Sequence, residues 1–252
     1  MKYVCVFAHQ DDEMRCLGTL LRLREAGHEI AFVTVTKGDK GLPYVLEADA
    51  VGVRDEEMRS VAAAFDAEYV CLGREDGYTY DDPGLRRDLL AAIRSTRADV
   101  LITHWTTDYN ADHVVTAKAV TDAALFANLA SFPTDPTTAF ATAASAEIAM
   151  DAAPLGAVPR IWYVDPGAGY GFEATHFVEL SPGHASRKAE LIRYHRSQMD
   201  VIRQLSGTDY ADQLADLDRL TGNRLMAGPT EAFRPCLAER RIPWPSDLPG
   251  RL

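Results

Sequence analysis

The stretch YVCVFAHQDDEMRCLGTLLRLREAGHEIAFVTVT, residues 3–36, decides the fold. It opens with the apolar run YVCVFA (3–8), which is typical of a parallel strand buried on both faces. Residues 13–26 then follow a helical pattern that ends at Gly27, and glycine is common just beyond the end of a helix. The β-branched run EIAFVTVT (29–36) reads as a second strand. A strand, a helix and a strand with short connections predict a βαβ unit of a parallel sheet.

The alternation of strands and helices continues along the first half of the chain. The remaining expected elements there are helix 51–66, strand 68–73, helix 84–96, strand 99–105 and helix 112–129. This order is typical of a Rossmann-like fold, in which helices cover both faces of a mostly parallel sheet. We therefore predict an α/β fold of this kind.

The second half of the chain has a weaker pattern. Residues 131–159 are rich in Pro, Thr and Ala and lack periodicity, which predicts a lid or an insertion. They are not expected to be a linker between domains, because strand-like runs follow at 160–164 and 175–180. A long helix is expected to start at Pro182. The tail from residue 207 has helical character up to Gly222 and then becomes irregular and Pro-rich.

The composition is that of one globular domain. A chain of 252 residues that is 47% hydrophobic and 25% charged can bury one substantial core, and α/β domains often reach this size. We therefore expect residues 1–252 to form a single domain. The formal net charge of −11 argues against a nucleic-acid or anionic-membrane partner, because both require a basic face. A homo-oligomer is compatible with the sequence.

The sequence predicts a protein of the cytoplasm. The N-terminal apolar run is too short for a signal peptide, and no run approaches the ~18 apolar residues of a membrane span. The four cysteines show no CxxC spacing, and Cys5 and Cys71 lie in strand-like runs where a small buried hydrophobe is expected. Reduced thiols of this kind are typical of an intracellular protein.

Polar clusters follow two of the predicted strands, at the edge where ligands bind in open parallel sheets. His9-Gln10-Asp11-Asp12-Glu13 follows the first strand, and the segment from His104 to His113 follows the fourth. Carboxylates beside a histidine repel one another unless a cation compensates them, and divalent metals take carboxylate and imidazole ligands. The first turn also lacks the GxGxxG pattern with which a dinucleotide fold holds pyrophosphate. The clusters predict a metal centre rather than a nucleotide site.

Two motifs resemble those of a known family. The segment AHQDDE (8–13) is similar to Ala-His-Pro-Asp-Asp-Glu, the hallmark of the LmbE-like, or PIG-L, deacetylases. The second hallmark, His-Pro-Asp-His at the start of a helix, resembles Asn110-Ala111-Asp112-His113. The similarity covers most of residues 3–130 and continues in patches. Those smaller similarities are the R-x-x-E of Arg54 and Glu57, the turn LGREDG (72–77), KAELIRYHRSQ (188–198) and EAFR (231–234).

The resemblance implies a zinc-dependent N-deacetylase, commonly acting on N-acetylglucosamine-type amides. By position, it implies that His9, Asp12 and His113 bind the metal and that Asp11 is the general base. Two histidines and one carboxylate leave a tetrahedral zinc one open position, as a catalytic site requires. Fe²⁺ or another divalent ion fits the same ligands. The implied partner is a small-molecule amide, a glycoside or a sugar conjugate.

Four residues are candidates for contact with the substrate. The resemblance implies this role for Arg54, and Asp76, Asp108 and Asn110 are polar residues expected at the rim of a site for hydroxyl-rich ligands. Asn110 stands where the family has a histidine near the scissile bond, and asparagine cannot titrate. This leaves the general acid open: Asp11 can return the proton that it accepts, or a neighbour such as His104 or Tyr109 can donate one.

Some of these residues also have a purely structural interpretation. Asn110 can cap the helix that follows it. Arg54 can pair with Glu57, three residues further along a helix. His195 lies on an amphipathic helix, where a packed histidine without a catalytic role is the other interpretation.

Two other functions compete with hydrolysis. Two histidines and a carboxylate also form the facial triad of non-haem iron enzymes. The loss of the titrating histidine at Asn110 is also compatible with a catalytically silent binding protein. Asp11, placed beside the implied ligand Asp12, favours hydrolysis over both, because neither alternative requires a base there.

Overall fold

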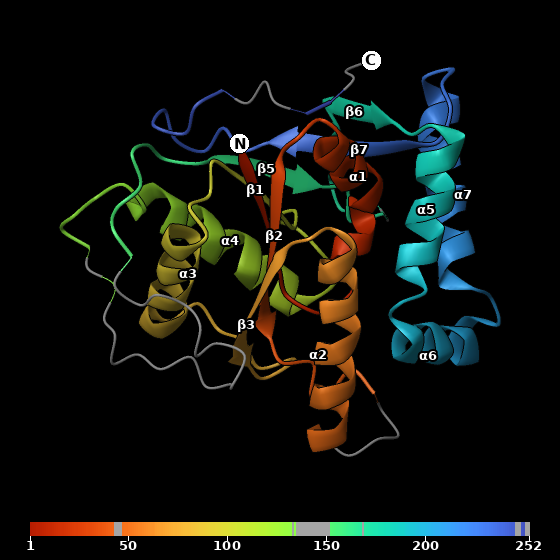
Figure 1. Ribbon diagram of the computed structural model, residues 1–252, viewed down its shortest axis with the longest axis horizontal. Helices are drawn as coiled ribbons and strands as arrows, with labels where there is room; N and C mark the ends of the chain where they lie inside the picture. Colours follow the sequence, from red (N-terminus) through yellow and green to blue (C-terminus); the bar gives the residue numbers. More distant parts are fainter. Residues whose placement is uncertain (43–46, 133, 135–151, 168, 245–247, 250–252) are drawn as a thin grey trace.

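The computed structural model of the chain contains a seven-stranded sheet with helices on both faces (Figure 1). It describes all residues except 43–46, 133, 135–151, 168, 245–247 and 250–252. The strands are β1 (Lys2–Phe7), β2 (Glu29–Thr36), β3 (Glu68–Arg74), β4 (Val100–Thr103), β5 (Arg160–Val164), β6 (His176–Glu179) and β7 (Thr230–Pro235). The helices are the 3-10 turn η1 (Asp12–Arg15), α1 (Leu17–Glu25), α2 (Glu47–Ala64), α3 (Pro83–Ser95), α4 (Ala111–Phe126), α5 (Pro182–Ile192), α6 (Arg196–Ser206) and α7 (Tyr210–Arg224).

The sheet has the order β3-β2-β1-β4-β5-β7-β6. β1 pairs in parallel with β2 on one side and with β4 on the other, whereas β7 is antiparallel to both of its neighbours. The expected mostly parallel α/β sheet is therefore confirmed. Because the chain leaves β1 toward β2 on one side and later returns to β4 on the other, a crevice opens beyond the carboxyl ends of β1 and β4. Ligands of open α/β sheets bind in such crevices.

Side chains of β1 enter two separate cores, because successive residues of a strand point to opposite faces. Tyr3, Cys5 and Phe7 pack in a core with residues of α1, α2, α5 and α7. Val4 and Val6 pack in a second core with residues of α3 and α4. Figure 1 shows α3 and α4 on one side of β1 and β2, and the other helices on the opposite side. Burial on both faces explains why this strand has no polar alternation.

The long helix expected from Pro182 is interrupted, which corrects the prediction. α5 ends at Ile192 and α6 begins at Arg196. His195 in the break is fully buried, and its Nε2 lies 2.7 Å from Oε1 of Glu13. The change of direction between α5 and α6 directs this imidazole toward the turn after β1. Helical periodicity does not reveal such a break, because the contact joins residues far apart in the chain.

The prediction that the tail is irregular beyond Gly222 is wrong for β7. This strand lies between β5 and β6, where a buried strand usually consists of apolar residues. Glu231 interrupts the apolar pattern that would predict a buried strand. Its buried carboxylate is tolerated because it lies 2.8 Å from Nζ of Lys188 and accepts a hydrogen bond from the Gly18 amide of α1. A charge satisfied by tertiary contacts cannot be recognised from the local sequence.

Two further expectations concern the remaining parts of the chain. Most of the lid or insertion expected at 131–159 lies outside the described residues, so that interpretation stays a prediction. None of the described helices is long and apolar enough to cross a membrane.

Candidate metal centre

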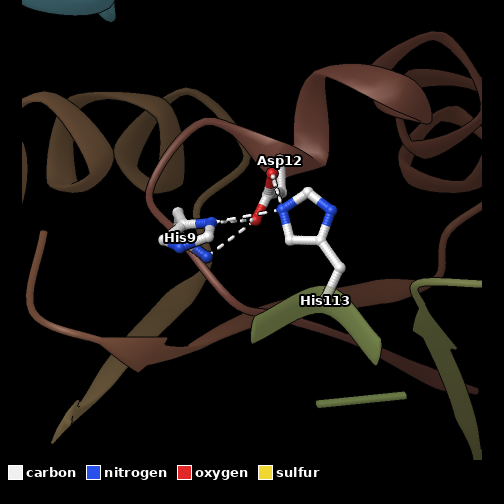
Figure 2. A group of neighbouring side chains, drawn as sticks. All are labelled: His9, Asp12 and His113. Atoms are coloured by element: carbon white, nitrogen blue, oxygen red, sulfur yellow. Dashed lines mark hydrogen bonds and ion pairs between the residues drawn. The ribbon is translucent and has the colours of Figure 1, made fainter. Parts of the chain in front are cut away.

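Three predicted site residues converge beyond the ends of β1 and β4. His9 and Asp12 belong to the turn that follows β1, and His113 lies in the first turn of α4. Their side chains point toward one another (Figure 2). Nδ1 of His9 lies 3.2 Å from Oδ2 of Asp12 and 3.2 Å from Nε2 of His113, which lies 3.3 Å from Oδ1 of Asp12. These donor atoms form a group that can hold a metal ion.

The spacing of the donor atoms fits zinc. Zinc binds histidine nitrogen and carboxylate oxygen at about 2.0–2.1 Å, so the edges of a tetrahedral site measure about 3.3 Å. The distances among His9, Asp12 and His113 are 3.2 to 3.3 Å. Two imidazole nitrogens facing each other at 3.2 Å also require a proton or a cation between them. The arrangement therefore suits a cation with two nitrogen ligands and one oxygen ligand.

A second carboxylate orients each histidine. Nε2 of His9 lies 3.2 Å from Oδ2 of Asp112, and Nδ1 of His113 lies 3.2 Å from Oδ2 of Asp108. Carboxylates in this position fix the ring orientation of metal-binding histidines and increase their basicity. Asp108 was expected to contact the substrate; its carboxylate lies against His113, and the residue also lines the smaller cavity described below. Asp112 also accepts the amide of Gly77 at 2.6 Å, which ties the turn after β3 to the cluster.

The charges around the cluster favour a positive ion at its centre. Burial lowers the pKa of His9, but Asp12 and Asp112 raise it to about 10. Burial likewise opposes protonation of His113, yet Asp12 and Asp108 raise its pKa to about 9. Although burial opposes ionisation of Asp12, the neighbouring histidines hold the pKa of its carboxyl well below the ordinary value. Without a metal, protons on the histidines supply this charge.

His104 has a supporting position. Its ring stacks on that of His113, with centroids 3.9 Å apart and planes 9° from parallel. Nε2 of His104 accepts the amide of Ala8 at 2.9 Å. Burial and the nearby His113 lower the pKa of His104 to about 4. It is therefore neutral near pH 7, which argues against its role as the general acid.

Asp11 lies beside the cluster in an unusual backbone conformation. Its φ of 135° is rare for a residue with a side chain, and such strain is characteristic of functional sites. Arg54 holds the turn by donating to Oδ1 of Asp11 at 2.8 Å and to the carbonyl of Gln10. Burial raises the pKa of Asp11 to about 6, with Arg54 opposing and Asp12 adding to this shift. Arg54 thus acts on Asp11, and Glu57, the alternative partner, accepts from Ser197 instead.

The other two predicted substrate contacts are engaged with the backbone. The carboxylate of Asp76 accepts the amides of Gly38 and Lys40, each at 3.1 Å. Oδ1 of Asn110 accepts the amide of Asp112 at 2.9 Å and caps α4. The side-chain oxygen of Asn110 therefore acts as the helix cap that was one of the two interpretations of this residue. Both residues still line the cavity described next.

The cluster lies between two cavities. The larger, of about 560 Å³, is lined by polar residues such as Lys40, Asp76 and Asn110. The smaller, of about 280 Å³, lies toward α6. Gln198 of α6 lines both; it is the last residue of the family-like segment 188–198 but was not among the predicted site residues. A bigger cavity of about 800 Å³, which Arg97 and Asp99 help to line at the opposite edge of the sheet, contains none of the cluster residues.

The sequence of this region matches a known family. Residues 4–124, which include all four of the predicted metal-binding and base residues, match the PIG-L family, described as GlcNAc-PI de-N-acetylase. This region belongs to the PIG-L family. The two hallmark segments identified from the sequence both lie within the PIG-L match. Among curated protein sequences, none is significantly similar to the chain.

Solved structures extend the similarity of the PIG-L region to nearly the whole chain. The N,N'-diacetylchitobiose deacetylase from Pyrococcus horikoshii is 20% identical, with a TM-score of 0.75 over 93% of this chain and 83% of that one. The 4-carboxy-2-hydroxymuconate hydratase from Pseudomonas putida is 17% identical, with a TM-score of 0.73 over 98% and 100%. Teicoplanin deacetylase in a zinc-inhibited form is 14% identical, with a TM-score of 0.64 over 95% and 100%. The fold is thus common to deacetylases and a hydratase.

Proposed function

We propose that the protein is a metal-dependent N-deacylase that hydrolyses the amide of an N-acetylglucosamine-type sugar or sugar conjugate. The observation that carries this proposal is Asp11, a strained and ionisable carboxyl adjacent to a three-residue metal-binding cluster. Membership of the PIG-L family and the deacetylases among the structural neighbours support the same reaction. The polar lining of the larger cavity suits a hydroxyl-rich substrate.

His9, Asp12 and His113 would hold the metal, and zinc fits their donor atoms and spacing. A zinc ion bound there would polarise the amide carbonyl and lower the pKa of a coordinated water to about 7. Asp108 and Asp112 keep the two imidazoles turned toward the centre of the cluster. Arg54 keeps the carboxylate of Asp11 in place.

Asp11 has the properties of a proton shuttle. With a pKa of about 6 it is ionised near pH 7, so it can accept a proton from the attacking water. The protonated carboxyl can then donate to the nitrogen of the departing amine as the C–N bond breaks. This route needs no titrating group at Asn110, and it leaves His104 in its neutral, supporting role. The products are a carboxylate and a free amine.

Release of amine from N-acetylated amino sugars tests the proposal. Protein loaded with zinc should release amine from N-acetylglucosamine or its conjugates without oxygen, and the Asp11→Asn variant should not. Activity that requires oxygen would favour the facial-triad alternative. If the protein binds metal and sugar but releases no amine from any N-acetylated amino sugar tested, a catalytically silent binding protein is favoured instead.

A further inference from the structure

The smaller cavity is polar where it meets the cluster and has an apolar part along α6. Apart from the cluster itself, the residues that line it include Met14, Trp105, Val164, Pro166, Val201 and Ile202. Polar residues line it as well, namely Asp11, Arg15, His104, Asp108, Tyr109, Gln198 and Tyr210. A guanidinium nitrogen of Arg15 lies 3.4 Å from the hydroxyl of Tyr210, and the amide of Gln198 donates to the carbonyl of Gly41 at 3.1 Å. A ligand that extends from the cluster along α6 therefore meets the apolar side chains of Val201 and Ile202.

One wall of the cavity is a helical stripe of α6. Gln198, Val201, Ile202 and Leu205 follow one another at the spacing that aligns side chains on one helix face. Val201 and Ile202 are half-buried, and Leu205 is 78% exposed. An incompletely covered apolar stripe that lines a cavity next to a reactive centre is typical of a ligand-binding surface.

The two cavities differ in chemistry in a way that matches the two halves of an amide. The larger cavity contains Lys40, Asp76 and Asn110, which suit a hydroxylated amine half. It is also lined by Asp112, and a carboxylate favours the ammonium that forms when the amine leaves. The acyl half then extends on the other side of the cluster, into the part of the smaller cavity that lies along α6.

The smaller cavity is large for an acetyl group. A methyl group is about the size of a water molecule, whose share of liquid volume is about 30 Å³. A cavity of about 280 Å³ therefore has room for a chain of several carbons. We propose that it is an acyl-chain subsite, and that the enzyme prefers an unbranched apolar acyl group of roughly six to eight carbons over acetyl. This inference rests on the proposed N-deacylase function.

The reaction is the same for either acyl group. Water adds its oxygen to the carbonyl carbon, the C–N bond breaks, and the nitrogen takes a proton. The products are glucosamine and acetate, or glucosamine and a medium-chain fatty acid. Only the part of the substrate that lies along α6 changes.

The test compares N-acetyl-, N-hexanoyl- and N-octanoylglucosamine with the zinc-loaded protein. The longer substrates should have kcat/KM values about 10- to 100-fold above that of the acetyl substrate, since methylenes in an apolar pocket are discriminated on this scale. Ile202→Trp fills the cavity and should lower the ratio of hexanoyl to acetyl kcat/KM at least ~10-fold. Leu220→Trp, at a half-exposed leucine of α7 outside the cavity lining, is the matched control and should leave the ratio unchanged.

A second measurement avoids dependence on the folding of a variant. Hexanoate should inhibit the wild-type enzyme at a concentration at least ~10-fold below that of acetate. If acetyl substrate is cleaved as well as hexanoyl substrate, or if Ile202→Trp leaves the ratio unchanged, the acyl-chain subsite is wrong and the N-deacylase function stands. If no amine is released from any of the three substrates, the proposed function fails and the subsite fails with it.

Discussion

Nη2 of Arg54 lies 2.8 Å from Oδ1 of Asp11 and holds this carboxylate beside the candidate metal centre. The Arg54 side chain is only 3% exposed, so solvent screens its charge weakly. The contact joins α2 to the turn after β1, across 43 positions of sequence. It gives the proposed base a fixed position and a permanent positive neighbour.

Asp11→Asn should retain the metal and lose activity. Asp11 neighbours the cluster but is not one of its three donor residues, so asparagine leaves the ligand set intact. Loss of a general base lowers kcat by at least ~10². Metal analysis and initial rates of amine release measure the two effects. Asp12→Asn is the control and should lose metal; if Asp11→Asn lost it instead, the roles of the two residues would be exchanged.

The rate of hydrolysis should fall on the acid side of about pH 6, because a general base must be ionised and burial raises the pKa of Asp11 to about 6. The positive charge of Arg54 lowers that pKa, so Arg54→Gln should move the acid limb to higher pH. A pH profile of kcat/KM detects the shift. Arg59→Gln, on the exposed side of the same helix, should leave the limb in place. An acid limb unchanged in Arg54→Gln would mean that another group titrates.

The sequence predicted the parallel half of the fold because the strands there are buried on both faces. The continuous apolar runs of β1 and β2 and the helices between them follow from local pattern alone. β7 escaped prediction because Glu231 and Pro235 are unusual in a central strand. The partners of Glu231 are Lys188 and the start of α1, which lie far from it in the sequence.

The candidate metal centre was also predictable only in part: the sequence pointed to its three donor residues but not to the residues that hold them in place. His9, Asp12 and His113 follow predicted strands whose carboxyl ends meet at one edge, so their convergence follows from the topology. The roles of Asp108 and Arg54 did not follow, because residue type alone does not say whether a carboxylate faces a substrate or a histidine. The apolar wall of α6 was also missed, since it comes from the other end of the chain.

Removal of the metal should abolish activity and leave the fold intact near pH 7. Protons can replace the cation, because the carboxylates, against the effect of burial, raise the pKa values of His9 and His113 to about 10 and about 9. This contribution to stability is complete below the unfolded pKa of about 6.5 and is lost as the pH rises toward 9 and 10.

The chelated protein should therefore lose stability between pH 7 and 10, and the zinc-loaded protein should lack this decline. Denaturant titrations monitored by circular dichroism measure both. Readdition of zinc is the control for reversible loss of activity. A chelated protein already unfolded at pH 7 would show that the cluster is structural.

Asn110→Ala should destabilise the protein by about 1 kcal/mol, the usual effect of removing a helix cap. The oxygen of Asn110 accepts the amide of Asp112 at the start of α4, and alanine leaves that amide without its partner.

Asn110→Ser separates this role from contact with the substrate, because serine caps a helix well and lacks the amide NH₂. If Asn110 acts only as a cap, Asn110→Ser should retain both the stability and the rate of the unmodified protein. A rate reduced at least ~10-fold in a stable Asn110→Ser variant would instead show that the amide NH₂ donates a hydrogen bond to the substrate or to the developing oxyanion, since loss of one such bond has an effect of this size. Unfolding free energies and kcat/KM, measured on the same two variants, decide between the two roles.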